Sequence, residues 1–134
     1  MAQRDAGLMD LDYEPPLEEP PMATLAAPIR VLDTRDKGRQ PLEPMQPRRV
    51  GILPTPPAWA GAVKLNLTAD EQAGAGWLSI DGGTTSKVNW REPGWTIANE
   101  ISVPLKNDGS WYIEVTSNVR THIVVDVCGF DSLI

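Results

Sequence analysis

Residues 62–68, Ala-Val-Lys-Leu-Asn-Leu-Thr, decide the fold class of this chain. Val63, Leu65 and Leu67 alternate with polar residues, and this period of two places them on one face of a half-buried β-strand. The chain also contains 13 prolines and 11 glycines, which disfavour helix interiors and favour short strands joined by turns. Together these features predict an all-β fold.

Similar strand candidates recur at close spacing along the rest of the chain. Seven or eight short strands with short turns predict a single β-sandwich or barrel-like domain. Asn107-Asp108-Gly109 predicts a hairpin turn between strands at 101–105 and 111–116. The last candidate, 121–130, is apolar on both faces and is expected to be a central strand. The remaining candidates are residues 29–34, 48–53, 77–80, 86–90 and 95–105.

Residues 1–28 differ in composition from residues 29–134, and the boundary between arm and β-domain is therefore expected after residue 28. The arm holds six acidic residues and one arginine, a net charge of −5, whereas the other 106 residues hold 12 acids and 11 bases, a net charge of −1. Two Pro-Pro pairs forbid one continuous helix and favour an extended chain. Composition alone is also compatible with a disordered solubilising tail. We expect instead that the arm binds a partner through spaced apolar anchors: Leu8, Leu11, Tyr13, Leu17 and Met22.

Several classes of function are disfavoured by composition. Neither part of the chain has the basic character that phosphate binding requires, so nucleic acid is not an expected partner. No apolar stretch approaches the length of a membrane span, and the first residues do not resemble a secretory signal. One cysteine and one histidine cannot form a disulfide or a transition-metal site, so neither metal nor cofactor is expected.

A series of motifs between residues 30 and 130 resembles a recurrent β-domain of actinobacteria and their phages. The motifs cover about three-quarters of the chain, with matching order and spacing. They are Val31-Leu32-Asp33-Thr34-Arg35, residues 62–68, Gly76-Trp77-Leu78, residues 86–90, Pro93-Gly94, Ile97-Ala98-Asn99, Asp108-Gly109 and residues 121–130.

The resemblance implies either a secreted cell-surface protein or a virion protein, and the missing secretory signal favours the virion. The expected function is therefore a capsid decoration protein that is assembled in the host cytoplasm. Its partner would be the major capsid protein or another virion protein, and its arm would contact neighbouring subunits. A homo-oligomer is expected, and coat proteins in that setting often form trimers. The alternatives are a minor tail protein and a carbohydrate- or cell-wall-binding module.

Catalysis is not expected from the polar residues. His122 and Asp126 would share one strand face but lie about 13 Å apart, which is too far for a hydrogen bond. Asp33 and Arg35 could form a binding site with Asp126, but a structural role is the favoured interpretation. In that interpretation Asp33 holds the loop after the first strand, and Arg35 pairs with a carboxylate. His122 is likewise expected to be a structural residue.

Five tryptophans are many for 134 residues. Tryptophan fills thin cores, anchors protein interfaces and provides stacking surfaces. If the domain binds carbohydrate, three aromatic residues are the expected exposed platforms: Trp90, Trp95 and Tyr112.

Overall fold

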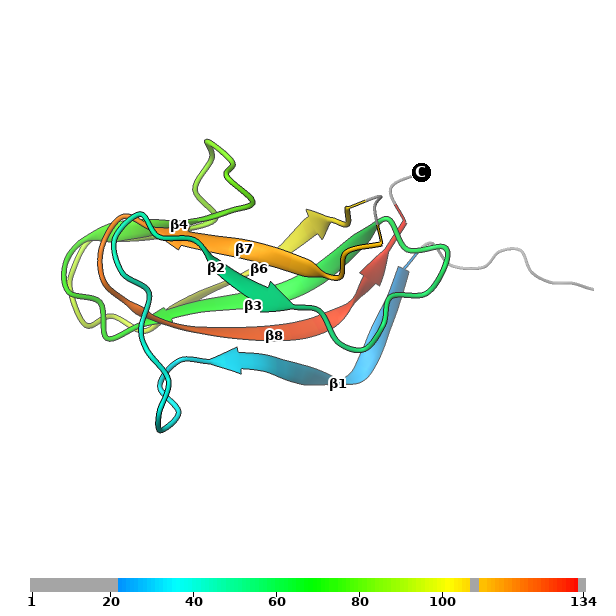
Figure 1. Cartoon of the computed structure of the whole chain (residues 1–134), viewed down its shortest axis with the longest axis horizontal. Coiled ribbons are helices and arrows are strands. Elements are labelled where there is room, and N and C mark those ends of the chain that lie inside the picture. The colour runs from blue at the N-terminus through cyan, green and yellow to red at the C-terminus, as the bar shows by residue number, and fades with distance from the viewer. Residues whose placement is uncertain (1–21, 107–108, 133–134) are drawn as a thin grey trace, which may run out of the picture.

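Eight antiparallel strands form two facing sheets in the computed structural model, which describes residues 22–106 and 109–132 (Figure 1). The first sheet has the order β1-β8-β3-β6 and the second β2-β7-β4-β5. The sheets do not close into a barrel, so of the two predicted architectures the sandwich-like one is confirmed. The strands are β1 (Met22–Asp33), β2 (Arg48–Gly51), β3 (Ala62–Asp70), β4 (Gly76–Ile80), β5 (Val88–Trp90), β6 (Ile97–Pro104), β7 (Tyr112–Ser117) and β8 (His122–Asp131).

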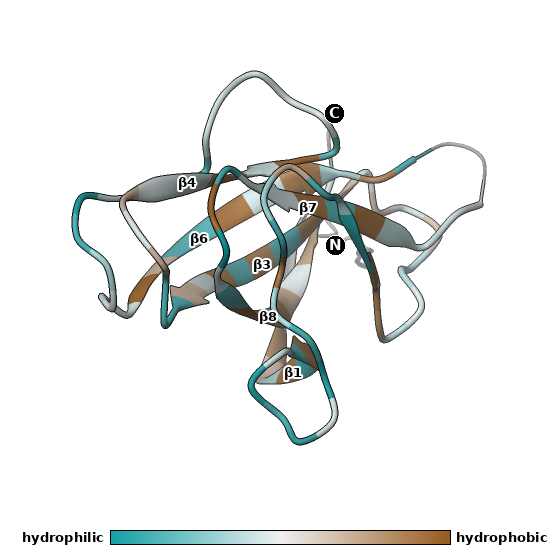
Figure 2. Cartoon of the chain, turned by 60° about the vertical axis from the view of Figure 1, so that its left-hand side comes forward, coloured by the Kyte–Doolittle hydropathy of each residue, from teal (hydrophilic) through white to brown (hydrophobic). Residues whose placement is uncertain are grey.

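The alternating pattern of β3 places every second side chain of this strand in the core. Val63, Leu65 and Leu67 are completely buried between the sheets, and the intervening polar residues face outward. Figure 2 shows this alternation of hydrophobic and hydrophilic residues along the strands. The facing sheet contributes apolar side chains in the same way: Val50, Leu78, Ile80, Val88, Trp90, Ile113 and Val115.

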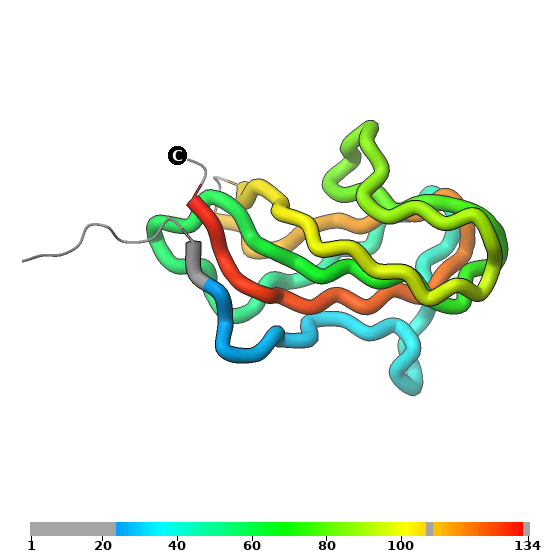
Figure 3. The backbone as a smooth tube through the Cα atoms, turned by 180° about the vertical axis from the view of Figure 1, so that it is seen from behind, coloured from blue at the N-terminus to red at the C-terminus, as the bar shows by residue number. Residues whose placement is uncertain are grey.

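Strand β8 lies inside the first sheet, between β1 and β3, as its two apolar faces predict (Figure 3). Both ladders skip Cys128, because Gly129 pairs with Thr24 and Lys64 while Val127 pairs with Ile29 and Leu65. This extra residue is a β-bulge, which reverses the alternation of faces beyond it. The bulge therefore places the side chains of both Val127 and Phe130 in the core.

Strand β1 begins seven residues before the predicted strand at 29–34. Its first residues pair with the end of β8, from Met22 opposite Asp131 to Thr24 opposite Gly129. Four residues, 25–28, then stand opposite the single residue Cys128, and Leu25 packs against the core. Residues 22–28 therefore belong to the β-domain, and the expected boundary after residue 28 lies inside a strand. The physical reason why the domain begins before residue 29 is that Leu25 packs against the apolar core.

The predicted hairpin around residues 107–109 is wrong. Strand β6 pairs with β3 in the first sheet, whereas β7 pairs with β2 and β4 in the second. The chain between them crosses from one sheet to the other. An Asn-Asp-Gly sequence allows a reversal of the chain but does not decide whether the flanking strands pair.

Candidate functional site

A network of ion pairs joins β1, β3 and β8 at the end of the sandwich where β8 begins. Asp33 accepts hydrogen bonds from the backbone and guanidinium of Arg35, at 2.9–3.0 Å. Arg35 also donates to Asp70 Oδ2 at 2.9 Å. Asp126 pairs with Arg30 at 2.9 Å, and Arg30 Nη1 lies 3.5 Å from Asp33. The structural role predicted for Asp33 and Arg35 therefore fits these contacts.

This network shifts the pKa values of its carboxyl groups. The hydrogen bonds from Arg35 lower the pKa of Asp33 to about 2, because they stabilise the ionised form against the cost of burial. Burial would raise the pKa of Asp70, but hydrogen bonds from Thr96, Arg35 and the Glu71 backbone outweigh it and the net pKa is lowered. Both groups are therefore held as carboxylates near neutral pH.

His122 and Asp126 are not in contact, as their spacing predicts. His122 Nδ1 lies 2.9 Å from the Thr34 hydroxyl, while Asp126 is held by Arg30. Thr34 is completely buried and also accepts a hydrogen bond from the backbone N–H of Ile123. A nucleophile has to reach its substrate. The Thr34–His122 pair therefore fastens β1 to β8 and offers no accessible attacking group.

The three predicted aromatic platforms have different surroundings. Trp90 is only 4% exposed, and its indole N–H donates to Gly74 O at 2.6 Å, so its prediction as a surface aromatic is wrong. It faces the core because Val88 and Trp90 share the inner face of β5. Trp95 is 49% exposed and is available for contact.

Tyr112 lies on the outer face of β7 but its ring is already covered. The guanidinium of Arg49 lies 3.9 Å from the ring centroid, and the ammonium of Lys106 lies 4.3 Å from it. These distances are those of cation–π interactions. A ligand would have to displace the cations before it could stack on Tyr112.

A second exposed apolar surface was not predicted from the sequence. Leu53 is 59% exposed, and Trp59 and Trp111 are 42% and 41% exposed. We call these three residues the Trp59–Trp111 surface. Ile52 N donates to Trp111 O at 2.8 Å, so Leu53 directly follows the residue that is bonded to Trp111. A groove of about 450 Å³ lies between residues 56–61 and 105–111; Trp111 lines it together with Pro56, Pro57, Leu105 and Lys106, whereas the Trp59 side chain does not.

The Trp59–Trp111 surface lies at the end of the sandwich where β1 begins. Gly61 donates to Asp131 O at 2.8 Å, and Asp131 is the β8 partner of Met22. The start of β1 and the segments that bear the surface are therefore neighbours, as the right-hand side of Figure 1 shows. Four of the predicted arm anchors, Leu8, Leu11, Tyr13 and Leu17, lie outside the described residues, and the fifth, Met22, is the first residue of β1. A sequence signal for the surface did exist, because prolines at 54, 56 and 57 precede Trp59 and place it in a loop.

No protein-family model matches the chain, and neither a curated protein nor a solved structure matches it. Within residues 22–106 and 109–132, no His, Cys, Asp and Glu side chains gather in a group that could hold a metal ion. The same residues include no helix of the length and apolarity needed to cross a membrane. The arrangement of exposed side chains is therefore the basis for assigning a function.

Proposed function

We propose that this protein is a phage virion structural protein that decorates the outer surface of a capsid. The β-domain would bind the shell through the Trp59–Trp111 surface, and the N-terminal segment would contact neighbouring subunits. The observation that carries this proposal is that Leu53, Trp59 and Trp111 are each exposed on segments at the same end of the sandwich, where β1 begins. The resemblance of residues 30–130 to phage and actinobacterial β-domains supports the setting.

Exposure of a large apolar side chain such as tryptophan to water is unfavourable. Large apolar side chains that gather on a surface generally mark an interaction site. Tryptophan is enriched among the residues that dominate binding energies, especially when neighbouring contacts exclude water around it. The prolines at 56 and 57 restrict the backbone next to Trp59, which reduces the entropy lost when a partner is bound.

The N-terminal segment supplies a second type of contact. Residues 1–21 hold six acidic residues and one arginine, a net charge of −5. Such a segment would be attracted to basic patches on neighbouring subunits, and the attraction would be screened by salt. Attachment should therefore combine an apolar contact that resists salt with an electrostatic contact that salt weakens.

Co-sedimentation with particles that lack this protein tests the proposal. Purified wild-type protein is expected to bind such particles at a saturable number of sites. The double variant Trp59→Ala/Trp111→Ala should bind at least about tenfold more weakly, because it removes two interfacial anchors. Trp95→Ala is the matched control, since it removes a similarly exposed tryptophan elsewhere and should bind normally. Equal binding by the double variant and the wild type would refute the role of this surface.

A further inference from the structure

Trp95 stands on a turn that presents its indole ring to solvent. Pro93 and Gly94 precede it, and Gly94 has a φ of 79°, a value that glycine adopts without strain. Trp95 is 49% exposed and lines a groove of about 430 Å³ together with Gly76, Asn89, Trp90 and Arg91. This volume falls within the range of about 300–1,000 Å³ that is typical of ligand sites.

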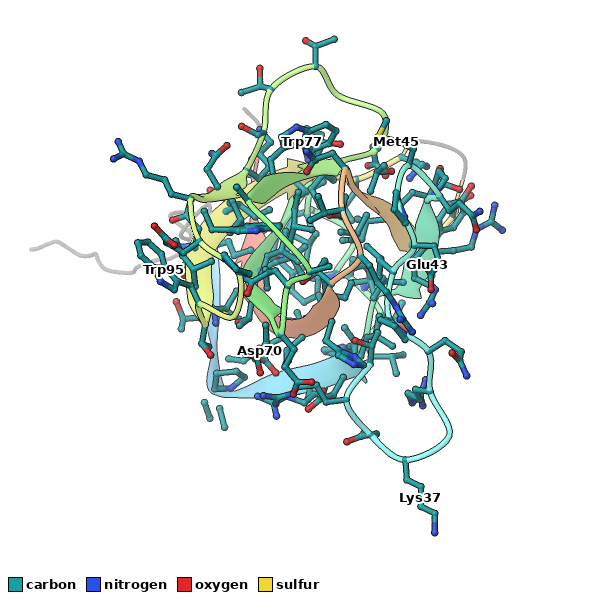
Figure 4. The ribbon with its side chains drawn as sticks, turned by 90° about the vertical axis from the view of Figure 1, so that its left-hand side faces the viewer. Lys37, Glu43, Met45, Asp70, Trp77 and Trp95 are labelled. Atoms are coloured by element: carbon teal, nitrogen blue, oxygen red, sulfur yellow. The ribbon has the colours of Figure 1, made fainter. Side chains whose placement is uncertain are left out.

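The turn that bears Trp95 is held in place by the ion-pair network. Thr96 Oγ1 donates to Asp70 Oδ1 at 2.7 Å, and the other oxygen of Asp70 accepts from Arg35. Figure 4 shows Trp95 projecting outward from the rim of the fold. A turn whose backbone is fixed in this way loses less conformational entropy when a ligand stacks on the tryptophan that it bears.

The floor of the groove is also rigid. Trp90 is buried beneath it and is fixed by its 2.6 Å hydrogen bond to Gly74 O. A Cβ atom at Gly76 would lie 2.5 Å from Asn118 Oδ1 and 2.8 Å from Val119 Cγ2. Glycine at position 76 therefore allows the close packing that forms the floor.

A second hollow lies next to the first on the outer face of β4 and β5. It measures about 400 Å³ and is lined by Trp77, Ser79, Gly83, Thr84 and Ser86. Asn89 lines the first hollow, pairs with Trp77 across the strands and accepts a 2.8 Å hydrogen bond from Ser86 Oγ. In Figure 4, Trp77 lies between β4 and the loop that follows it. The two hollows are therefore neighbours at this edge of the sheet, and we call them together the track.

The chemistry of this track fits a chain of sugar rings. We propose that the track binds a glycan, with the C–H face of one ring stacked on Trp95. The amide of Asn89, the guanidinium of Arg91 and the hydroxyl of Thr84 would hydrogen-bond to sugar hydroxyls. An aromatic ring with polar groups around it matches a ligand that has one apolar face and a polar rim.

A peptide fits the same place less well. Strand β5 lies at the edge of its sheet, where an extended peptide could add as a further strand. However, β5 has only three residues, and Pro93 follows shortly after it. So short an edge offers few backbone hydrogen bonds, whereas the side chains of the track offer an aromatic face and several polar groups.

Isothermal titration calorimetry of the full chain with soluble oligosaccharides tests this proposal. The panel consists of hexamers of β-1,4-glucose, β-1,4-N-acetylglucosamine, β-1,3-glucose and α-1,5-arabinose. At least one is expected to bind with a Kd below about 1 mM, and Trp95→Ala should weaken that binding about tenfold or more. Trp111→Ala is the matched control and should leave it unchanged, because Trp111 lies beside Ile52 and Leu105, away from this track.

Two further measurements make the outcome decisive. Trp95→Ala should unfold at nearly the same temperature as the wild type, because about half of Trp95 is exposed and it is not part of the core cluster. Binding of none of the four hexamers, or binding that Trp95→Ala does not weaken, would overturn the proposal. Binding of an extended peptide that is lost in Trp95→Ala, without glycan binding, would also overturn it. Because Trp95→Ala should still bind capsids, failure of the glycan site and failure of the attachment surface are distinguishable.

Discussion

Arg35 Nη1 lies 2.9 Å from Asp70 Oδ2, so the loop after β1 is tied to the last residue of β3. The same guanidinium holds Asp33 through Nε and Nη2, both at 2.9 Å. Thr96 occupies the other oxygen of Asp70 at 2.7 Å. The position of the turn that presents Trp95 is therefore coupled to the start of the loop after β1.

This network predicts a loss of stability in acid. The pKa of Asp33 is about 2 in the folded protein, below the ordinary value of 3.8, because Arg35 stabilises its ionised form. Protons therefore bind the unfolded state more readily, and the free energy of unfolding should fall as pH drops from about 4 to about 2. Urea unfolding at pH values between 2 and 5 measures this slope. In Arg35→Gln the slope should be shallower, and an unchanged slope would show that Arg35 does not set this pKa.

Leu67→Ala should destabilise the protein by about 2–5 kcal/mol, because it leaves a cavity between the sheets. Leu67 is completely buried and belongs to the central cluster. Leu53→Ala removes the same atoms from an exposed position and should change stability by no more than about 0.5 kcal/mol. Urea denaturation of both variants checks the pair. A similar loss in the two variants would contradict the described burial.

Gly76→Ala should destabilise by about 1–3 kcal/mol, as overpacking does in a closely packed region. The added Cβ would meet the side chains of Asn118 and Val119. Gly51→Ala is the matched control, because Gly51 is also in a strand but has no atom within 4 Å of the added Cβ. Thermal unfolding should separate the two variants, and a Gly76→Ala protein as stable as the control would show that this packing is looser than described.

Truncation should separate the N-terminal segment from strand β1. Deleting residues 1–21 removes no described strand and should leave the unfolding midpoint close to that of the full chain. Deleting residues 1–28 removes the pairing of 22–24 with 129–131 and the packing of Leu25, and should cost about 2 kcal/mol or more. Circular dichroism during urea titration measures both. Equal stability of the two truncations would mean that residues 22–28 contribute nothing to the folded domain.

The fold class followed from the sequence because it depends on local alternation. Val63, Leu65 and Leu67 alternate with polar residues wherever their strand is placed, and all three are in the core. Strand pairing depends on contacts between distant segments, and the turn sequence around residue 108 could not reveal that β6 and β7 lie in different sheets. The bulge at Cys128 could not be predicted from the sequence either, because it depends on how β8 pairs with both β1 and β3. Its effect is to turn the Phe130 side chain into the core.

The candidate surfaces were only partly predictable for a related reason. The sequence identified Trp95 as an exposed aromatic, and its exposure agrees. The sequence-based prediction that Trp90 is exposed was wrong, since a strand of three residues is too short to show which of its faces is buried. Trp59 and Trp111 lie far apart in the chain, and backbone contacts of their neighbours bring them to one end of the sandwich.

Electron microscopy of the virion tests the attachment proposal most directly. If the proposal is correct, reconstruction of phage particles that contain this protein should show one sandwich-like density per binding position on the outer shell. The end that bears Trp59 and Trp111 should face the capsid. Particles that carry the Trp59→Ala/Trp111→Ala variant should lose that density, whereas particles with Trp95→Ala should keep it. Absence of the protein from the capsid surface of wild-type particles would contradict the proposed function.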